Sequence, residues 1–145
     1  MNYTEKTLID ILNTSIHKKK GNIQLNNEID WNYMLQLSKE HNVSSLVYYG
    51  LKNSNIVDNI PSDIINEFKK YTFFTASHQI RHIKNIEEVL NLFHKNNIQT
   101  VVLKGLVVRS FYPNAEFRTM GDADIVVKKE KLDKAINLLR DLGYE

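Results

Sequence analysis

Two aspartates, Asp122 and Asp124, stand two residues apart at the start of an apolar, β-branched run that ends at Val127. Residues i and i+2 of a strand share one face, so in a strand both carboxylates point to the same side, and Ala123, Ile125 and Val127 point to the other. An ionised carboxylate is costly to bury without a compensating partner, and a hard cation such as Mg²⁺ takes carboxylate oxygens. Such pairs can hold metal ions for an in-line displacement at phosphorus. The spacing therefore predicts a metal site.

A second candidate element lies upstream, where the apolar run Val101–Leu103 ends in Lys104 and Gly105. Glycine permits a close approach of the backbone to a ligand. The N-terminus of a following helix offers free N–H groups to a phosphate, and Lys104 adds a point charge for the same anion. We expect this turn and the aspartate pair to face one site, with phosphate chemistry on a nucleotide.

Each of these features also has a structural interpretation. Aspartate is common in solvent-facing turns, and Lys104-Gly105 can be a plain strand-to-helix turn with a solvated lysine. Arg118 can contact a phosphate or brace Asp122, since arginine often packs against a neighbouring carboxylate. His78 and His82 lie four residues apart, but no metalloprotease glutamate accompanies them, so we interpret both as ordinary helix residues.

Composition sets the class of protein. The chain has 145 residues, enough for one domain or one small domain plus an extension. Its net charge of +2 is too small to indicate nucleic acid binding. No cysteine is present, which excludes disulfides and cysteine-rich zinc sites. There is no apolar run of about 18 residues to span a membrane and no signal peptide pattern, so we expect no membrane partner and a cytoplasmic protein.

The first two thirds of the chain have helical periodicity. We expect helix N-caps at Thr4, Asp30 and Ser44, with a break at Gly21 and the asparagine-rich stretch to Asn27. His41-Asn42 should end the second helix, because asparagine tolerates the left-handed conformation at a helix C-terminus. Ser62 opens the longest pattern, which Asn96-Asn97 ends. A helix of about thirty residues is long for a globular protein, so a kink or break near residues 72–77 would be no surprise. Its expected buried stripe consists of Phe68, Ile80, Ile83, Ile86, Leu90 and Phe93.

From Ile98 the periodicity changes. We predict strands at 98–103 and 122–127, a short helix at 106–111, and a helix at 130–142 closed by Gly143. The last helix should turn Leu132, Ala135, Ile136, Leu139 and Leu142 inward. The fold class is α/β, more closely α+β, with a helical region at 1–96 followed by a strand-helix-strand-helix unit at 97–145.

The ordered motifs resemble the polymerase-beta-type nucleotidyltransferase superfamily, and within it a bacterial, uncharacterised nucleotidyltransferase family with a Lys-Gly turn. The residues that carry this resemblance are Val101-Val102-Leu103-Lys104-Gly105, Tyr112-Pro113, Arg118, Asp122-Ala123-Asp124 and Gly143-Tyr144, in that order. The helical leader with Trp31 is also similar, so the resemblance covers most of the chain.

The resemblance implies Mg²⁺-dependent transfer of a nucleoside monophosphate from an NTP to an unknown acceptor, which is a small molecule, a protein or an RNA end. It implies Asp122 and Asp124 as catalytic metal ligands, and Lys104, Gly105 and Arg118 as the triphosphate contacts. The superfamily commonly has Gly-Ser or Gly-Gly at the turn, and it places a third carboxylate on the next strand. We do not assign that role to the terminal Glu145, so 97–145 is interpreted as the start of a core that the natural protein continues, or as an incomplete catalytic set. The alternative is a non-catalytic module that binds a nucleotide or a protein through a degenerate nucleotidyltransferase unit.

Overall fold

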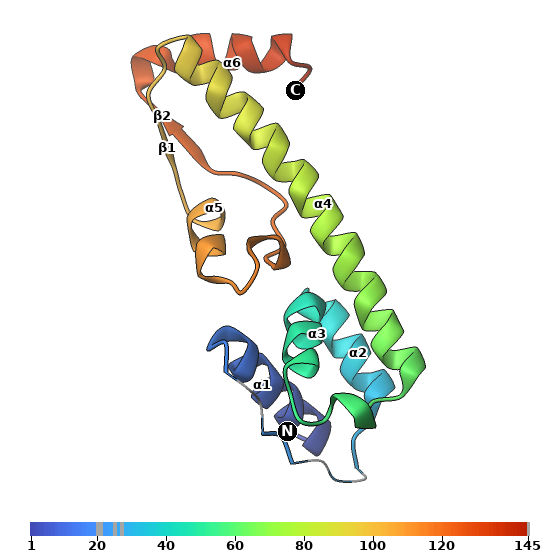
Figure 1. Ribbon diagram of the computed structural model, residues 1–145. Coiled ribbons are helices and arrows are strands. Elements are labelled where there is room, and N and C mark those ends of the chain that lie inside the picture. Colours follow the sequence, from blue (N-terminus) through green and yellow to red (C-terminus); the bar gives the residue numbers. More distant parts are fainter. Residues whose placement is uncertain (20–21, 25, 27, 145) are drawn as a thin grey trace.

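A computed structural model of the chain describes residues 1–19, 22–24, 26 and 28–144. The expected helix break at Gly21 and Asn27 and the terminal Glu145 lie outside the described residues. One long diagonal helix runs from a group of three helices near the N-terminus to a two-stranded sheet and a final helix near the C-terminus (Figure 1).

The elements follow the predicted order, with helices first and the two strands after the change of periodicity at Ile98. The helices are α1 (Tyr3–Ile16), α2 (Trp31–Glu40), α3 (Ser44–Lys52), α4 (Ser62–Lys95), α5 (Gly105–Val108) and α6 (Leu132–Asp141), and the strands are β1 (Thr100–Val102) and β2 (Ile125–Val127). The two strands pair antiparallel, with Val101 opposite Val126. The fold is α+β with helices leading the chain, as predicted. In the described part of the chain, no helix has the length and apolarity that a bilayer crossing requires.

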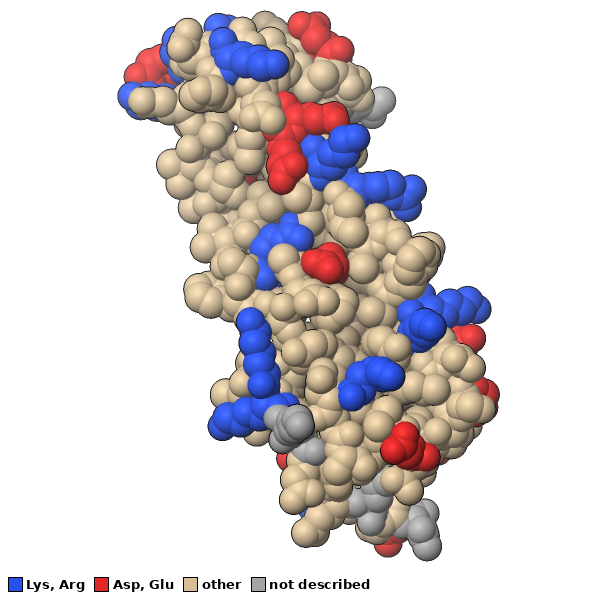
Figure 2. All heavy atoms as spheres, in the orientation of Figure 1, with Lys and Arg blue, Asp and Glu red and all other residues tan. Residues whose placement is uncertain are grey.

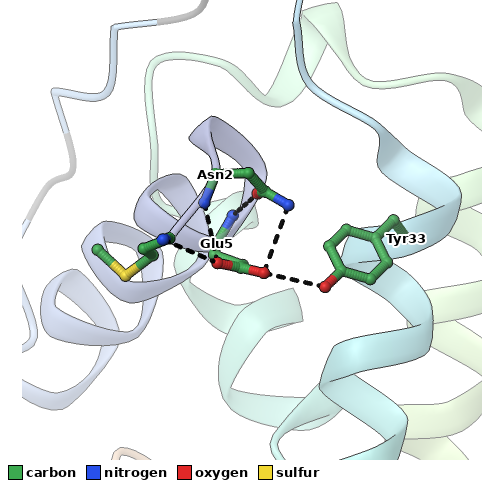
Figure 3. Close-up of polar contacts among 4 residues, drawn as sticks. Asn2, Glu5 and Tyr33 are labelled. Carbon is green, nitrogen blue, oxygen red and sulfur yellow. Dashed lines mark hydrogen bonds and ion pairs between the residues drawn. The ribbon is translucent and has the colours of Figure 1, made fainter.

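Helix α1 begins with a cap different from the predicted one. Asn2, not Thr4, is the N-cap: its side chain accepts a hydrogen bond from Glu5 N, and the Glu5 carboxylate accepts one from Asn2 N, both at 2.9 Å (Figure 3). This reciprocal capping box satisfies two free donors at once. Thr4 is buried instead, and its hydroxyl accepts a hydrogen bond from Asp30 N at 3.0 Å.

The next two helices divide the predictions. Asp30 caps α2 by accepting a hydrogen bond from Tyr33 N at 2.9 Å, as expected. Asn42 follows α2 in the left-handed conformation, with φ +55°, also as expected. Ser44 is not the cap of α3, because it is already the first helical residue and Val43 precedes it without a side-chain cap. The Ser44 hydroxyl instead lies 3.1 Å from that of buried Ser38.

Helices α1 and α3 pack unusually closely. A Cβ on Gly50 of α3 would lie 2.7 Å from the carbonyl oxygen of Ile11 in α1, so glycine is needed there for steric reasons. The first core cluster surrounds this contact and joins α1, α2, α3 and the first turns of α4. Its buried residues are Leu8, Ile11, Ile23, Met34, Leu35, Val47, Leu51, Ile56, Ile60, Ile64 and Phe68.

Helix α4 is one uninterrupted α-helix of 34 residues, so no break occurs at 72–77. It begins after Pro61, and Asn97 ends it with φ +55°. The predicted buried stripe was wrong at Ile80, which is 58% exposed, because the buried face passes through Gln79. The buried residues are Ile64, Phe68, Thr72, Gln79, Ile86, Val89 and Phe93.

The second core cluster is smaller and holds the sheet and α6 against the end of α4. Its buried members are Val89, Phe93, Ile98 and Ala135. Of the α6 residues predicted to face inward, Leu132, Ile136 and Leu142 are exposed. Leu132 and Ile136 nevertheless line the apolar cavity between α6, α4 and β2, so they face that side without being closely covered. Gly143 follows α6 with φ +86°, in agreement with the expected C-cap.

Candidate functional site

The Lys104–Gly105 turn joins β1 directly to α5. Leu103 N donates to the carbonyl of Asp124 at 3.0 Å, which extends the pairing of the two strands by one hydrogen bond. Lys104 then adopts φ +48° and ψ −107°, and α5 begins at Gly105. The predicted helix at 106–111 is therefore a single α-helical turn, Gly105–Val108, followed by a 3₁₀ turn at Arg109–Phe111.

The aspartate pair lies immediately before β2 rather than within it. We expected the strand to begin at Asp122, but it begins at Ile125. The reason is the sharp turn at Lys104. It directs the segment after β1 away from β2, so the residues before Asp124 have no strand beside them to pair with. The alternation of side chains nevertheless holds, since Ala123, Ile125 and Val127 line one cavity together, as predicted for that face.

An ion pair links the two predicted parts of the site. Lys104 Nζ lies 3.2 Å from Asp124 Oδ2, and the two side chains are 77% and 41% exposed. At this exposure such a pair contributes at most about 1 kcal/mol to stability. Its importance is geometric, because residues 20 positions apart in the chain meet at one point. Asp122, two residues before Asp124, is exposed to solvent.

Arg118 belongs to the same neighbourhood. Its Nη2 would lie 3.8 Å from a Cβ on Gly105, and its Nη1 donates to the carbonyl of Thr119 at 3.1 Å. Within the described residues, Arg118 makes no ion pair with Asp122, and its buried Nε has no protein partner. The guanidinium therefore lies at the Lys104–Gly105 turn, next to the residues that we expected to bind phosphate, rather than bracing Asp122.

Two residues that sequence reasoning did not single out complete the surroundings. Met120 is 8% exposed, and its Sδ would lie 2.8 Å from a Cβ on Gly105. Gln79 of α4 is 4% exposed and hydrogen-bonds the backbone of Met120. Gln79 lies seven positions before Ile86, a spacing that places both on one face of a helix, and this was the available sequence signal. Assigning Ile80 to the buried face left Gln79 outside the prediction.

The donor set fits one class of metal. In the described part of the chain, no three His, Asp or Glu side chains gather closely enough to enclose an ion. Mg²⁺ does not require such a cage, because it is usually held by one or two carboxylates together with substrate phosphates and water. Asp122 and Asp124 supply hard oxygen donors of this kind, so they fit Mg²⁺ with a bound triphosphate better than a protein-enclosed ion.

A separate apolar cavity of about 380 Å³ lies between α4, β2 and α6, on the other face of β2 from the Lys104–Asp124 pair. Lys and Arg side chains are interspersed with Asp and Glu on the face seen in Figure 2, rather than gathered into a basic stripe. This distribution agrees with the small net charge. That face therefore has no continuous basic stripe to contact the phosphate backbone of a nucleic acid.

Comparison with known proteins identifies one family. The profile of a family described as uncharacterised nucleotidyltransferase matches residues 27–145, which includes every residue of the candidate site. Searches of curated proteins and of solved structures gave no match.

Proposed function

The chain belongs to the uncharacterised nucleotidyltransferase family, and from this premise we propose that it transfers a nucleoside monophosphate from an NTP to an acceptor with the help of Mg²⁺. Membership supports nucleotide transfer and an NTP substrate in general. The assignment of Asp122 and Asp124 as catalytic metal ligands, and of Lys104, Gly105 and Arg118 as triphosphate contacts, is the part proposed here. The acceptor is unidentified.

The observation that carries the proposal is the 3.2 Å ion pair between Lys104 and Asp124. It joins the predicted phosphate turn to Asp124, one of the two proposed metal ligands, and Arg118 lies beside Gly105. Without nucleotide, Lys104 neutralises one carboxylate of the pair. With a metal-bound triphosphate present, the carboxylates have a cation of their own, and Lys104 is free to exchange Asp124 for a phosphate oxygen.

The chemistry that follows is an in-line displacement. An acceptor oxygen attacks the α-phosphorus, the bond from that phosphorus to the bridging oxygen of the β-phosphate breaks, and pyrophosphate leaves. Bound Mg²⁺ supplies charge stabilisation for the phosphate oxygens. Lys104 and Arg118 hold the triphosphate, and the backbone at Gly105 allows it to approach, so the protein contributes mainly positioning and electrostatics.

The test is the melting temperature with each of the four NTPs, with and without Mg²⁺, for the wild type and the double variant Asp122→Asn/Asp124→Asn. Ligand at about a hundred times its Kd adds roughly 2.7 kcal/mol to stability, a shift of several degrees. We expect a Mg²⁺-dependent shift that the double variant loses. The control Asp10→Asn/Asp58→Asn removes the same charge at two exposed sites outside the candidate site and should keep the shift.

The alternative is a module that binds a nucleotide or a protein without transferring a group. A nucleotide-binding module predicts the same shift but no pyrophosphate release, and a protein-binding module predicts neither. Pyrophosphate measured over time with candidate acceptors separates the two functions. No shift with any NTP in the wild type, or an equal shift in the wild type and the Asp122→Asn/Asp124→Asn protein, would contradict the proposed site.

A further inference from the structure

The side chain of Gln79 is bonded at both ends to one residue 41 positions later in the chain. Its Nε2 donates to the carbonyl of Met120 at 3.1 Å, and its Oε1 accepts a hydrogen bond from Met120 N at 3.1 Å. The Gln79 side chain is 4% exposed. A buried carboxamide is costly unless it is paired, and here one residue pairs both its donor and its acceptor.

The same two bonds solve a problem for the backbone of Met120. Residues 118–124 contain no helix or strand, so the N–H and C=O of Met120 have no strand to pair with, although Met120 is buried. Buried backbone groups must nevertheless be paired. Gln79 supplies both partners, as a neighbouring strand would, and thereby ties a segment without regular structure to the most extended helix of the fold.

Met120 connects this tie to the candidate site on two sides. Asp122 and Asp124 follow it by two and four residues. Its side chain packs against Gly105, where an added Cβ would lie 2.8 Å from Sδ. The position of Met120 therefore affects both the placement of the segment that carries Asp122 and Asp124 and the packing beneath the Lys104–Gly105 turn.

We infer that Gln79 is a positioning residue of the nucleotide site: through the backbone of Met120 it holds the Asp122–Asp124 segment in register with the Lys104–Gly105 turn. This inference rests on the proposed function, and it adds a residue of the helical region that does not itself contact the nucleotide. Residues that orient metal ligands from behind commonly change metal affinity or activity by about 10- to 100-fold when replaced.

The decisive variant is Gln79→Glu, which keeps the shape of the side chain. When ionised, the introduced carboxylate still accepts a hydrogen bond from Met120 N. Its second oxygen cannot donate to the carbonyl of Met120, so two acceptors face each other and repel. When protonated, it donates to that carbonyl as glutamine does, and burial raises the pKa of such a group. We expect the Kd for an NTP with Mg²⁺ to rise about tenfold or more at pH 8 and to return toward the wild-type value at pH 6, relative to wild type measured at the same pH.

The matched control is Thr72→Val on the same buried face of α4. The Thr72 hydroxyl donates only to the Phe68 carbonyl of its own helix, at 2.8 Å, so its loss destabilises α4 without releasing Met120. All Kd values are measured below the melting transition of each protein. A Gln79→Glu protein that is less stable but binds with the wild-type Kd at both pH values would overturn the inference.

Amide hydrogen exchange tests the tie without any nucleotide. The Met120 N–H donates to Gln79 Oε1 at 3.1 Å, so this amide reports on the tie. In Gln79→Met, a variant of similar bulk that cannot pair with Met120, exchange of the Met120 amide should accelerate at least about tenfold, and in Thr72→Val it should not. Unchanged exchange in Gln79→Met would overturn the inference even if nucleotide binding is confirmed. Accelerated exchange in Gln79→Met, together with a wild type that binds no NTP, would overturn the proposed function and, with it, the positioning role.

Discussion

At the scale of single residues, Lys104 combines a functional charge with an unfavourable backbone. Its φ of +48° and ψ of −107° lie near the first central position of a type II′ turn, which glycine dominates. A side chain held in such a region costs on the order of 1–3 kcal/mol. The ion pair with Asp124 contributes less than that, so lysine at this position lowers stability. A charge retained against its conformational cost is consistent with a role in binding.

Replacing Lys104 by glycine should have opposite effects on stability and on nucleotide binding. Lys104→Gly should increase the free energy of unfolding by about 1 kcal/mol or more, because the strain is relieved, and should weaken NTP binding, because the ammonium is lost. Lys104→Ala loses the same charge but keeps a Cβ, so it should bind as weakly without the gain. Denaturant unfolding and nucleotide titration of the three proteins measure both quantities. Equal stability of the glycine and alanine variants would show that the backbone is not strained.

At the scale of elements, helices α1 and α2 are joined by a carboxylate-phenol contact. Tyr33 of α2 donates its hydroxyl to Glu5 Oε1 at 3.0 Å, next to the capping box (Figure 3). Hydrogen bonds from the Asn2 backbone and then from Tyr33 hold the pKa of Glu5 below its usual range. The same bond raises the pKa of Tyr33, because losing its proton would place two anions together.

These two shifts predict a stability contribution confined to a pH window. Glu5 contributes above its unfolded pKa of about 4.3, and this contribution is lost as pH falls through its lowered folded pKa. Tyr33 contributes below its unfolded pKa of about 10, and this contribution is lost as pH rises through its raised folded pKa. The difference in melting temperature between wild type and Tyr33→Phe should therefore be largest from about pH 5 to pH 9 and shrink on both sides.

The check for this window is the Glu5→Gln background, in which Tyr33 has no carboxylate partner. There, Tyr33→Phe should have a smaller effect with no loss toward acid pH. An effect of Tyr33→Phe in the wild type that stays constant from pH 3 to pH 7 would mean that the hydroxyl stabilises the α1–α2 contact independently of Glu5.

At the scale of the whole molecule, periodicity predicted the order of the elements but not their edges. The change of period at Ile98, the cap at Asp30 and the turns at Asn42 and Gly143 depend on local chemistry, and all were predicted. Thr4, Ser44 and Ile80 were assigned wrongly because Asn2 is a competing cap and because packing selects the buried face of α4. The tie between Gln79 and Met120 spans 41 residues, and no local pattern encodes such a contact.

The candidate site divides in the same way. Residue types and spacing alone predicted the Lys-Gly turn and the aspartate pair, and the alternation around Ala123 and Ile125 followed from strand geometry. That Asp124 would pair with Lys104, and that β2 would begin only at Ile125, depended on the sharp turn at Lys104. A positive φ at a lysine has no sequence signal, since glycine and asparagine are the residues that normally mark it.

Helix α4 spans two cores of unequal size, and this predicts where the molecule opens first. Phe68 is buried among the first cluster, and Phe93 among the second, which has few buried residues and leaves part of α6 exposed. Regions with few buried apolar contacts open with the lowest free energy. Phe68→Ala should lower the global free energy of unfolding by about 3–5 kcal/mol and accelerate exchange of the most protected amides of α1–α3. Phe93→Ala should accelerate exchange mainly in residues 98–142 and leave α1–α3 protected. If Phe93→Ala accelerated exchange equally in α1–α3, the two cores would unfold as one unit. The candidate site, whose turn and carboxylates both lie after Ile98, would then be as stable as the helices that precede it.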